Sequence, residues 1–262
     1  MEKNELLIIA EGLYQEAFDA NCIYLMIEQY RNVNKKHHEI LGYFPAFYNL
    51  TFNALMSQCF MELAKLYDNN GISLGTLLSA CKENETIFPE YREKIEYVID
   101  GETYTSEVPY QHKLRPSEEI FFKEEVEAQR ILYGIFSDED VSKIPVQKDF
   151  TFSELLDLYH MRFNSLSKKK ENLRVQRNKI YAHNDEDNRF NNKLVLQQYP
   201  ISFPDVKELI GFALDVTRMV IGILTDVSRP EAYSNMDDFE YMIEFVEKGM
   251  ELQKKEIEKM SL

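Results

Sequence analysis

Residues 151–181 carry the sequence TFSELLDLYHMRFNSLSKKKENLRVQRNKIY, and this stretch predicts one long helix. Its first four residues fit a capping box, in which the Thr151 hydroxyl and the Glu154 carboxylate satisfy free backbone amides at a helix start. Seven further residues recur at alternating steps of three and four, which places them on one face of a helix. They are Tyr159, Phe163, Leu166, Lys170, Leu173, Arg177 and Ile180. Two cations therefore interrupt an otherwise apolar face.

The second half of the same stretch is strongly basic. Between Arg162 and Lys179 the chain has seven basic residues and one acid, Glu171, so the local formal charge is +6, whereas the whole chain carries −15. A charge run of this kind usually forms the solvated face of a helix. Arg177 is not explained in this way, because it lies on the apolar face and burying an unpaired charge between apolar residues is costly. Arg177 therefore needs either a carboxylate partner in the core or a functional cavity.

His183 follows Arg177 by six residues. On a continuous helix the two side chains would point roughly 120° apart. They converge more easily if the helix ends before His183 and this residue folds back, and the polar Asn184-Asp185 pair favours such an end. Taken alone, a single His is more often structural or exposed than catalytic.

The rest of the chain also favours helices. Its 9 Gly and 8 Pro form about 6% of the 262 residues, against about 12% in average proteins. Apolar residues at helical spacing predict further helices over about 6–30, 46–67, 74–78, 117–136, 203–220 and from 236 onward. We expect an irregular excursion or small hairpin at 99–116, a connection at 137–150 and a loop at 184–198. The predicted fold is all-α: a helical bundle with a small irregular insertion.

Composition excludes several classes of protein. The net charge of −15 repels phosphate at long range, so a general nucleic-acid coat protein is excluded, although a local basic site is not. The three cysteines lie far apart, at 22, 59 and 81, which fits reduced thiols better than a disulfide framework or a zinc site. The apolar run 6–10 is short and flanked by acids, so we expect a cytoplasmic protein without a membrane span.

The segment Arg177-Asn178-Lys179-Ile180-Tyr181-Ala182-His183 resembles the active-site motif of the HEPN superfamily, in which an Arg and a polar residue precede a His. It lies late in a long predicted helix, before a polar loop and another helix. A second stretch, Leu66-Tyr67-Asp68 followed by Ser73-Leu74 and Leu77-Leu78, resembles the AbiU-type branch, which is associated with bacterial abortive infection. The resemblance covers roughly residues 40–225, outside the excursion at 99–116 and the C-terminal helix. It implies a single HEPN-like domain over 1–262.

The resemblance also implies an activity, that of a metal-independent endoribonuclease without a cofactor. RNA carries its own nucleophile, the 2′-hydroxyl beside the scissile phosphate. His183 would move protons, because imidazole titrates near neutral pH. Arg177 would hold the phosphate charge in its planar fork, and Asn178 would orient His183 or the phosphate. The neighbouring cations that would bind the RNA backbone are Lys169, Lys170, Arg174 and Lys179.

Partners are implied in the same way. In the superfamily two motifs meet at a homodimer interface, and a face on which Lys170 and Arg177 interrupt apolar residues suits an interface better than a dry core. We therefore expect a homodimer that buries the helix over 151–181. The resemblance further implies an RNA substrate such as tRNA, a toxin role in phage defence, and an antitoxin protein as a partner.

One position departs from the pattern and keeps a second function open. Some HEPN toxins carry a Tyr two residues after the His, which a partner nucleotidyltransferase modifies, whereas this chain has Asp185. That acid argues against this form of silencing and would weaken RNA binding. The alternative is a non-catalytic HEPN-like module that binds nucleotide or a protein partner. His37-His38, His160 and the acids at 185–187 lack metal-ligand spacing, so no metal site is expected.

Overall fold

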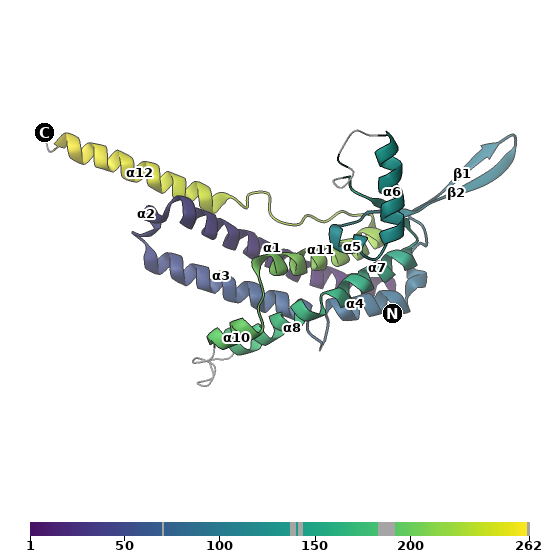
Figure 1. The fold of residues 1–262 in the computed structure, drawn as a ribbon, viewed down its shortest axis with the longest axis horizontal. Helices are drawn as coiled ribbons and strands as arrows, with labels where there is room; N and C mark the ends of the chain where they lie inside the picture. The colour runs from purple at the N-terminus through teal and green to yellow at the C-terminus, as the bar shows by residue number, and fades with distance from the viewer. Residues whose placement is uncertain (70, 137–139, 141–143, 183–191, 261–262) are drawn as a thin grey trace.

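The computed structural model describes residues 1–69, 71–136, 140, 144–182 and 192–260, and over these the chain is mostly α-helical (Figure 1). The first part contains α1 (Lys3–Lys36), α2 (His38–Leu41), α3 (Pro45–Leu66), α4 (Leu74–Glu83) and the 3-10 turn η1 (Glu85–Ile87). The middle contains β1 (Glu93–Ile99), β2 (Glu102–Val108), β3 (Tyr110–Lys113), α5 (Pro116–Glu119), α6 (Lys123–Phe136) and β4 (Gln147–Phe150). The last part contains α7 (Phe152–Ser165), α8 (Ser167–Gln176), the π-helix η3 (Arg177–Ala182), α10 (Asn192–Gln198), α11 (Phe203–Thr225) and α12 (Asp238–Met260). The prediction of a helical fold is confirmed.

The centre of the bundle is α1, which packs along α3 on one side and α11 on the other. Its buried face carries apolar residues at helical spacing, and three of them are alanines that let the neighbouring helices approach closely: Ala10, Ala17 and Ala20. Cys59 and Cys81 are buried in the same core and Cys22 is half-buried, all as free thiols. Among the helices that the structure describes, none is long and apolar enough to cross a membrane.

The single helix predicted over 151–181 is wrong, because the segment bends at Leu166 (φ −80°, ψ 1°) between α7 and α8. The Ser165 hydroxyl donates to the carbonyl oxygen of Arg162 at 2.7 Å, a side-chain bond that competes with the helix ladder at this point. The capping box at Thr151 and Glu154 is confirmed. From Arg177 the α-helix continues as the wider π-turn η3.

Four further segments differ from the predictions. The excursion expected at 99–116 begins earlier, as the antiparallel hairpin β1–β2, whose turn places Asp100 and Gly101 at positive φ, the geometry of a two-residue hairpin loop. The helix expected at 117–136 is divided into α5 and α6, and the connection before α7 ends in β4, which pairs with β3. The loop expected at 184–198 ends in the helix α10, whose Val195 is buried, while 183–191 lie outside the described residues.

A buried ionic cluster joins this middle region to the bundle. Glu118 of α5 is fully buried, and its carboxylate accepts hydrogen bonds from His112 Nε2 and the Arg115 amide, each at 2.8 Å. Arg162 of α7, also buried, lies 3.0 Å from Glu118 Oε1 and donates to Asp215 of α11 at 3.0 Å. Burial alone would raise the pKa of Glu118, but these hydrogen bonds and the Arg162 charge lower it below its usual value.

Glu118→Gln should therefore destabilise the protein by about 3 kcal/mol at pH 7, because it leaves the buried Arg162 guanidinium partly uncompensated. A lowered pKa makes the ionised carboxylate stabilising above its unfolded pKa of about 4.3, and that contribution is lost as the pH falls below it. The difference between parent and variant should accordingly shrink between pH 5 and pH 3, measured by urea unfolding.

The matched control is Glu119→Gln, which removes the next carboxylate along the chain. Glu119 pairs with Arg130 near the surface, so its loss should cost less than about 1 kcal/mol. Equal losses for the two variants would show that the buried cluster contributes no more than a surface ion pair.

Candidate functional site

Arg177 stands at the first position of η3, where its Nη2 donates to Asp68 Oδ2 at 3.0 Å. Asp68 lies just past the end of α3, so this ion pair joins two segments that are 109 residues apart in the chain. The side chains of Arg177 and Asp68 are 23% and 30% exposed. Asp68 is therefore a half-buried carboxylate and not a fully buried core acid. The Nε atom of Arg177 is buried without a hydrogen-bond partner.

The turn that carries the motif is anchored on its apolar side. Tyr181 packs its ring 4.6 Å from that of Phe60 on α3, and burial raises the pKa of the Tyr181 hydroxyl. A π-turn holds one more residue per hydrogen-bonded ring than an α-turn, and such turns occur frequently at functional sites. Asn178, the second predicted site residue, is half-buried on the same turn. His183, the predicted proton carrier, lies outside the described residues, as do Asn184 and Asp185.

Two amides tie the preceding helix to the chain that returns after residue 191. Asn172 donates to the carbonyl oxygen of Pro200 at 2.5 Å, and Gln176 donates to that of Tyr199 at 2.6 Å. Both side chains are buried, so these bonds are protected from water. They hold α8 beside the segment that leads into α11, so both flanks of residues 183–191 are held close together.

The cations predicted to bind RNA are already engaged within the chain. Lys169 pairs with Asp205 at 2.9 Å and with Glu208, both from α11, while Arg174 makes a two-bond pair with Glu171. Lys179 lies 5.8 Å from the ring centroid of Tyr199. The two acids of α11 lie 36 and 39 residues after Lys169 in sequence, so the local charge count could not reveal them.

Lys170 has a different environment, because its ammonium lies 3.2 Å from the centroid of the Phe163 ring. The Phe163 ring packs closely on Gly75 of α4. A Cβ added at Gly75 would lie 3.2 Å from the ring. Burial lowers the pKa of Lys170 to about 8. Of the face expected at a homodimer interface, Leu166 and Leu173 are buried in the core of the single chain and Lys170 covers Phe163, while the homodimer itself stays a prediction.

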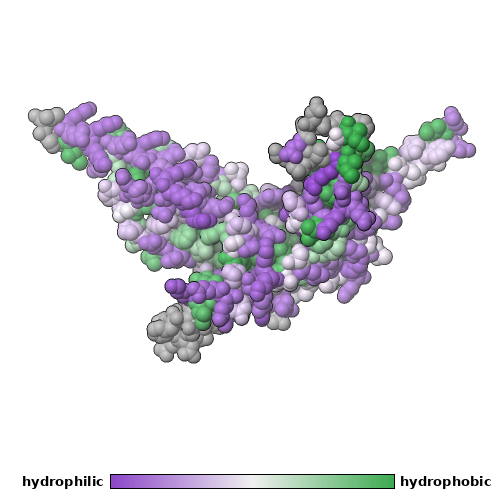
Figure 2. Space-filling view, viewed as in Figure 1, coloured by the Kyte–Doolittle hydropathy of each residue, from purple (hydrophilic) through white to green (hydrophobic). Residues whose placement is uncertain are grey.

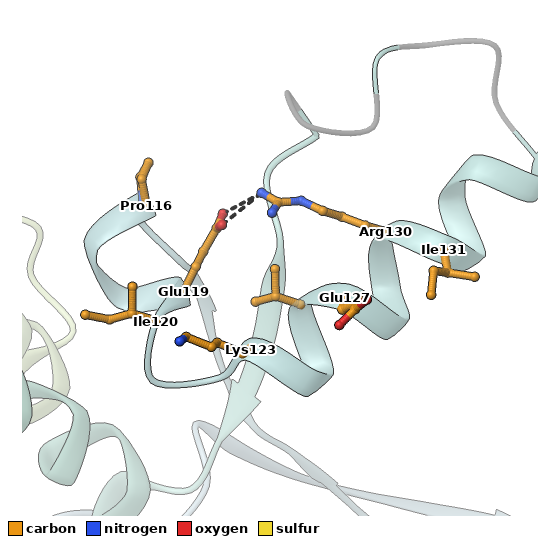
Figure 3. Close-up of a pocket in the computed structure, with 8 residues that line it drawn as sticks. Pro116, Glu119, Ile120, Lys123, Glu127, Arg130 and Ile131 are labelled. Carbon is orange, nitrogen blue, oxygen red and sulfur yellow. Dashed lines mark hydrogen bonds and ion pairs between the residues drawn. The ribbon is translucent and has the colours of Figure 1, made fainter.

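Two cavities lie elsewhere and are not lined by the motif. One, of about 660 Å³, is bordered by Tyr110, His112, Tyr159, Asp215 and Arg218, next to the buried ionic cluster. The other, of about 540 Å³, is an open groove between α5 and α6, crossed by the Glu119–Arg130 pair (Figure 3). Figure 2 shows apolar surface above this groove on α6, where Ile131, Leu132 and Ile135 are exposed. Sequence reasoning found neither cavity: the lining of the first comes from segments far apart in the chain, and the second depends on the break between α5 and α6.

A mostly helical fold with Arg177 and Asn178 on the turn that ends a helical segment is the arrangement of the HEPN class of proteins. Within that class, the family model described as AbiU2 matches residues 3–242, and the chain belongs to this family. The match reaches beyond the expected residues 40–225 and includes α1, the hairpin and the start of α12. Searches of curated proteins and of solved structures gave no significant match.

Lys170→Met should raise the melting temperature at pH 7, because a half-buried ammonium without a carboxylate partner is replaced by an apolar side chain of similar length. Below about pH 8 the folded protein carries this charge at a cost, and that cost disappears as the pH rises toward the unfolded pKa of about 10.4. The gain in melting temperature should therefore be larger at pH 7 than at pH 10.

Lys168→Met provides the control, because Lys168 is exposed on the same helix. Thermal melts of both variants at the two pH values make the comparison. A Lys170→Met gain that is independent of pH would contradict the assignment to the buried charge.

Proposed function

We propose that this chain is a metal-independent HEPN endoribonuclease with a toxin or phage-defence role, in which Arg177, Asn178 and His183 act on RNA. The observation that carries the proposal is the state of Arg177. Its guanidinium is partly exposed, and its acid partner among the described residues, the half-buried Asp68, accepts one hydrogen bond from it. An arginine has five N–H donors, so one bond to Asp68 leaves capacity for phosphate oxygens.

The proposed reaction balances with the residues of one motif. His183 takes the proton of the 2′-hydroxyl, and the 2′-oxygen attacks the adjacent phosphorus. Arg177 stabilises the negative charge that develops on the phosphate, and Asn178 orients the reacting groups. The bond from phosphorus to the 5′-oxygen breaks, and the protonated imidazole returns the proton to that oxygen. The products are a 2′,3′-cyclic phosphate end and a 5′-hydroxyl end.

Membership of the AbiU2 family supports the abortive-infection setting. Within that setting, an RNA substrate such as tRNA and an antitoxin partner belong to the proposal. The RNA backbone contacts fall first to Lys179 and to the donors of Arg177 that its single bond to Asp68 leaves open, whereas Lys169 is held by two carboxylates and Arg174 makes two bonds to Glu171. RNA binding should therefore be local and not spread over the whole basic segment.

The alternative function is a non-catalytic HEPN module that binds nucleotide or a protein partner. The neutralisation of Lys169 and Arg174 within the chain favours it, because few cations of the basic segment then remain to hold a polyanion. The two functions differ in whether removal of His183 abolishes cleavage.

If the protein cleaves RNA, cleavage should continue in excess EDTA and leave 2′,3′-cyclic phosphate ends. The reason is that the proposed charge stabiliser is an arginine, so no metal ion is required at the phosphate. End-group analysis of cleaved oligonucleotides, with and without EDTA, provides the measurement. Loss of cleavage on chelation, with recovery on adding magnesium, would exclude the proposed chemistry.

His183→Ala should reduce RNA cleavage by about 10²–10⁴-fold without changing the melting temperature, as expected for a general acid–base group. Arg177→Ala should abolish cleavage as well. Lys169→Ala should leave cleavage nearly unchanged, because its ammonium is paired with Asp205 and Glu208. Purified variants are compared on a cellular RNA mixture, with circular dichroism melts alongside.

The variant Asp68→Asn tests whether Arg177 binds phosphate or only stabilises the fold. It removes the acid partner but keeps the shape, so a phosphate-binding Arg177 should retain cleavage in this variant. Its cost in stability should stay below about 1 kcal/mol, as for other partly exposed pairs. A His183→Ala variant that cleaves as fast as the parent would reject the ribonuclease proposal in favour of the binding module.

A further inference from the structure

The larger of the two cavities lies at the end of the bundle from which the hairpin β1–β2 projects (Figure 1). Its volume is about 660 Å³, and its walls come from α7, β3, the second half of α11 and the chain at 89–92 and 226–229. None of the described residues of the motif, 177–182, lines it. A cavity of this size admits a small organic molecule.

Most charged side chains at this cavity are already paired within the chain. The ion pairs that neutralise them are Asp215 with Arg115 and Arg162, Arg218 with Glu231, and Arg229 with Glu11. His112 also borders the cavity, and its Nε2 lies 2.8 Å from the carboxylate of the buried Glu118, which Arg162 contacts as well. The four arginines and four acids of these pairs balance one another, so they favour neither sign of charge in a ligand.

Arg92 and Asp226 line the same cavity but differ from these paired groups. Within the part of the chain that the structure describes, neither side chain makes an ion pair or a hydrogen bond. Arg92 directly precedes β1, whereas Asp226 ends α11 in the left-handed conformation, at φ 57°, with its backbone amide donating to the carbonyl oxygen of Gly222 at 2.8 Å. The cavity therefore offers a ligand one unpaired cation and one unpaired anion.

Tyr159 adds a hydroxyl without a partner. This residue of α7 is only 5% exposed, and its ring packs near those of His112 and Phe212. Its hydroxyl makes no hydrogen bond to the described residues, although buried hydroxyls are normally paired. Burial holds the pKa of Tyr159 well above its usual value, so the hydroxyl stays protonated and can donate. Because Tyr159 borders the cavity, a molecule bound there can supply the missing partner.

The rest of the lining provides apolar surface beside these polar groups. Its apolar residues are Pro89, Met219, Ile223 and Val227. The ring of Tyr110 is fixed next to them, because its hydroxyl donates to the carbonyl oxygen of Pro89 at 2.9 Å. Burial, with the Asp226 charge nearby, raises the pKa of Tyr110 to about 12, so the Asp226 carboxylate acts on this wall. Such a lining suits a molecule that combines charged groups with an apolar side chain.

The charge balance decides between classes of ligand. A nucleotide or another polyanion would find one unpaired arginine, would face the Asp226 carboxylate and would approach a chain of net charge −15. A simple amine would leave Arg92 without a partner. A zwitterion satisfies both groups, because a carboxylate matches the planar fork of a guanidinium and an ammonium group donates to a carboxylate.

We propose that this cavity binds a free α-amino acid with an apolar side chain. Arg92 binds the carboxylate of the amino acid, to which the Tyr159 hydroxyl also donates, and Asp226 binds its ammonium group. The side chain of the ligand lies against the apolar wall formed by Met219, Ile223 and Val227. The site is separate from the proposed RNA site, and the proposal does not depend on RNA cleavage.

Isothermal titration calorimetry of the full chain against L-leucine, L-methionine and L-phenylalanine tests the proposal. At least one of them should bind at millimolar concentration or below. Two analogues of that amino acid, one lacking the ammonium group and one lacking the carboxylate, should each bind about ten- to a hundredfold more weakly, because each loses a charged hydrogen bond. If none of the three amino acids binds, or if an analogue with a single charge binds as tightly, the proposal is overturned.

Substitutions at the two unpaired charges locate the site. Arg92→Ala and Asp226→Asn should each weaken binding about ten- to a hundredfold without changing the melting temperature, because neither side chain makes a contact that the substitution would remove. Asparagine tolerates the left-handed conformation, so Asp226→Asn keeps the backbone. The matched controls are Lys113→Ala, an exposed cation outside the cavity, and Asp100→Asn, also at positive φ, and both should bind like the parent.

Tyr159→Phe tests the buried hydroxyl. It should weaken binding but leave the melting temperature of the unliganded protein unchanged, because the hydroxyl makes no bond to the described chain. A lower melting temperature with unchanged binding would show that the hydroxyl is structural and remove it from the site. Binding that survives both Arg92→Ala and Asp226→Asn would overturn the assignment of the ligand to this cavity.

Discussion

The buried guanidinium of Arg162 is the constraint on which the arrangement of this chain depends. It lies between the carboxylates of Glu118 and Asp215, each 3.0 Å away, and so joins the short helix α5, the helix α7 and the long helix α11. A charge this deep in a protein is tolerated only when its partners are in place, and removing one partner costs several kcal/mol. The strands β3 and β4 and the helix α5 are therefore joined to the bundle by this ionic cluster as well as by apolar side chains such as Leu114 and Phe150, whereas α1, α3 and α11 are held together by apolar packing.

The need of a cation for a partner also explains the basic segment 162–179. Its formal charge is +6, but most of its cations are paired within the folded chain. Lys169 forms ion pairs with two acids of α11, and Arg174 forms one with Glu171. The Lys170 ammonium lies over the ring of Phe163. Arg177 is also paired, with the half-buried Asp68, and it differs from these cations in that its Nε is buried without a hydrogen-bond partner. Cations that the fold has neutralised stabilise the bundle. Arg177, which stands on a π-turn, is the cation to which the proposed function assigns the phosphate.

Apolar surface is distributed by a similar logic. On the apolar face of α7 and α8, Leu166 and Leu173 are buried in the core. The apolar residues of α12 divide instead into a seated half, which packs on Tyr30 and its neighbours, and a projecting half, which does not.

The sequence by itself determined the helical class, most helix positions, the capping box at Thr151 and the HEPN motif from Arg177 onward. These depend on spacing and on residues close in the chain, so periodicity and short motifs suffice to predict them. Only the tertiary structure decided that the segment bends at Leu166, that residues 192–198 are helical and that Asp68 is the partner of Arg177. It also decided that Lys169 faces acids from another helix and that α12 projects from the body. Each of these outcomes depends on contacts between residues far apart in sequence, where the free energy of burying a charge or an apolar side chain outweighs local propensity.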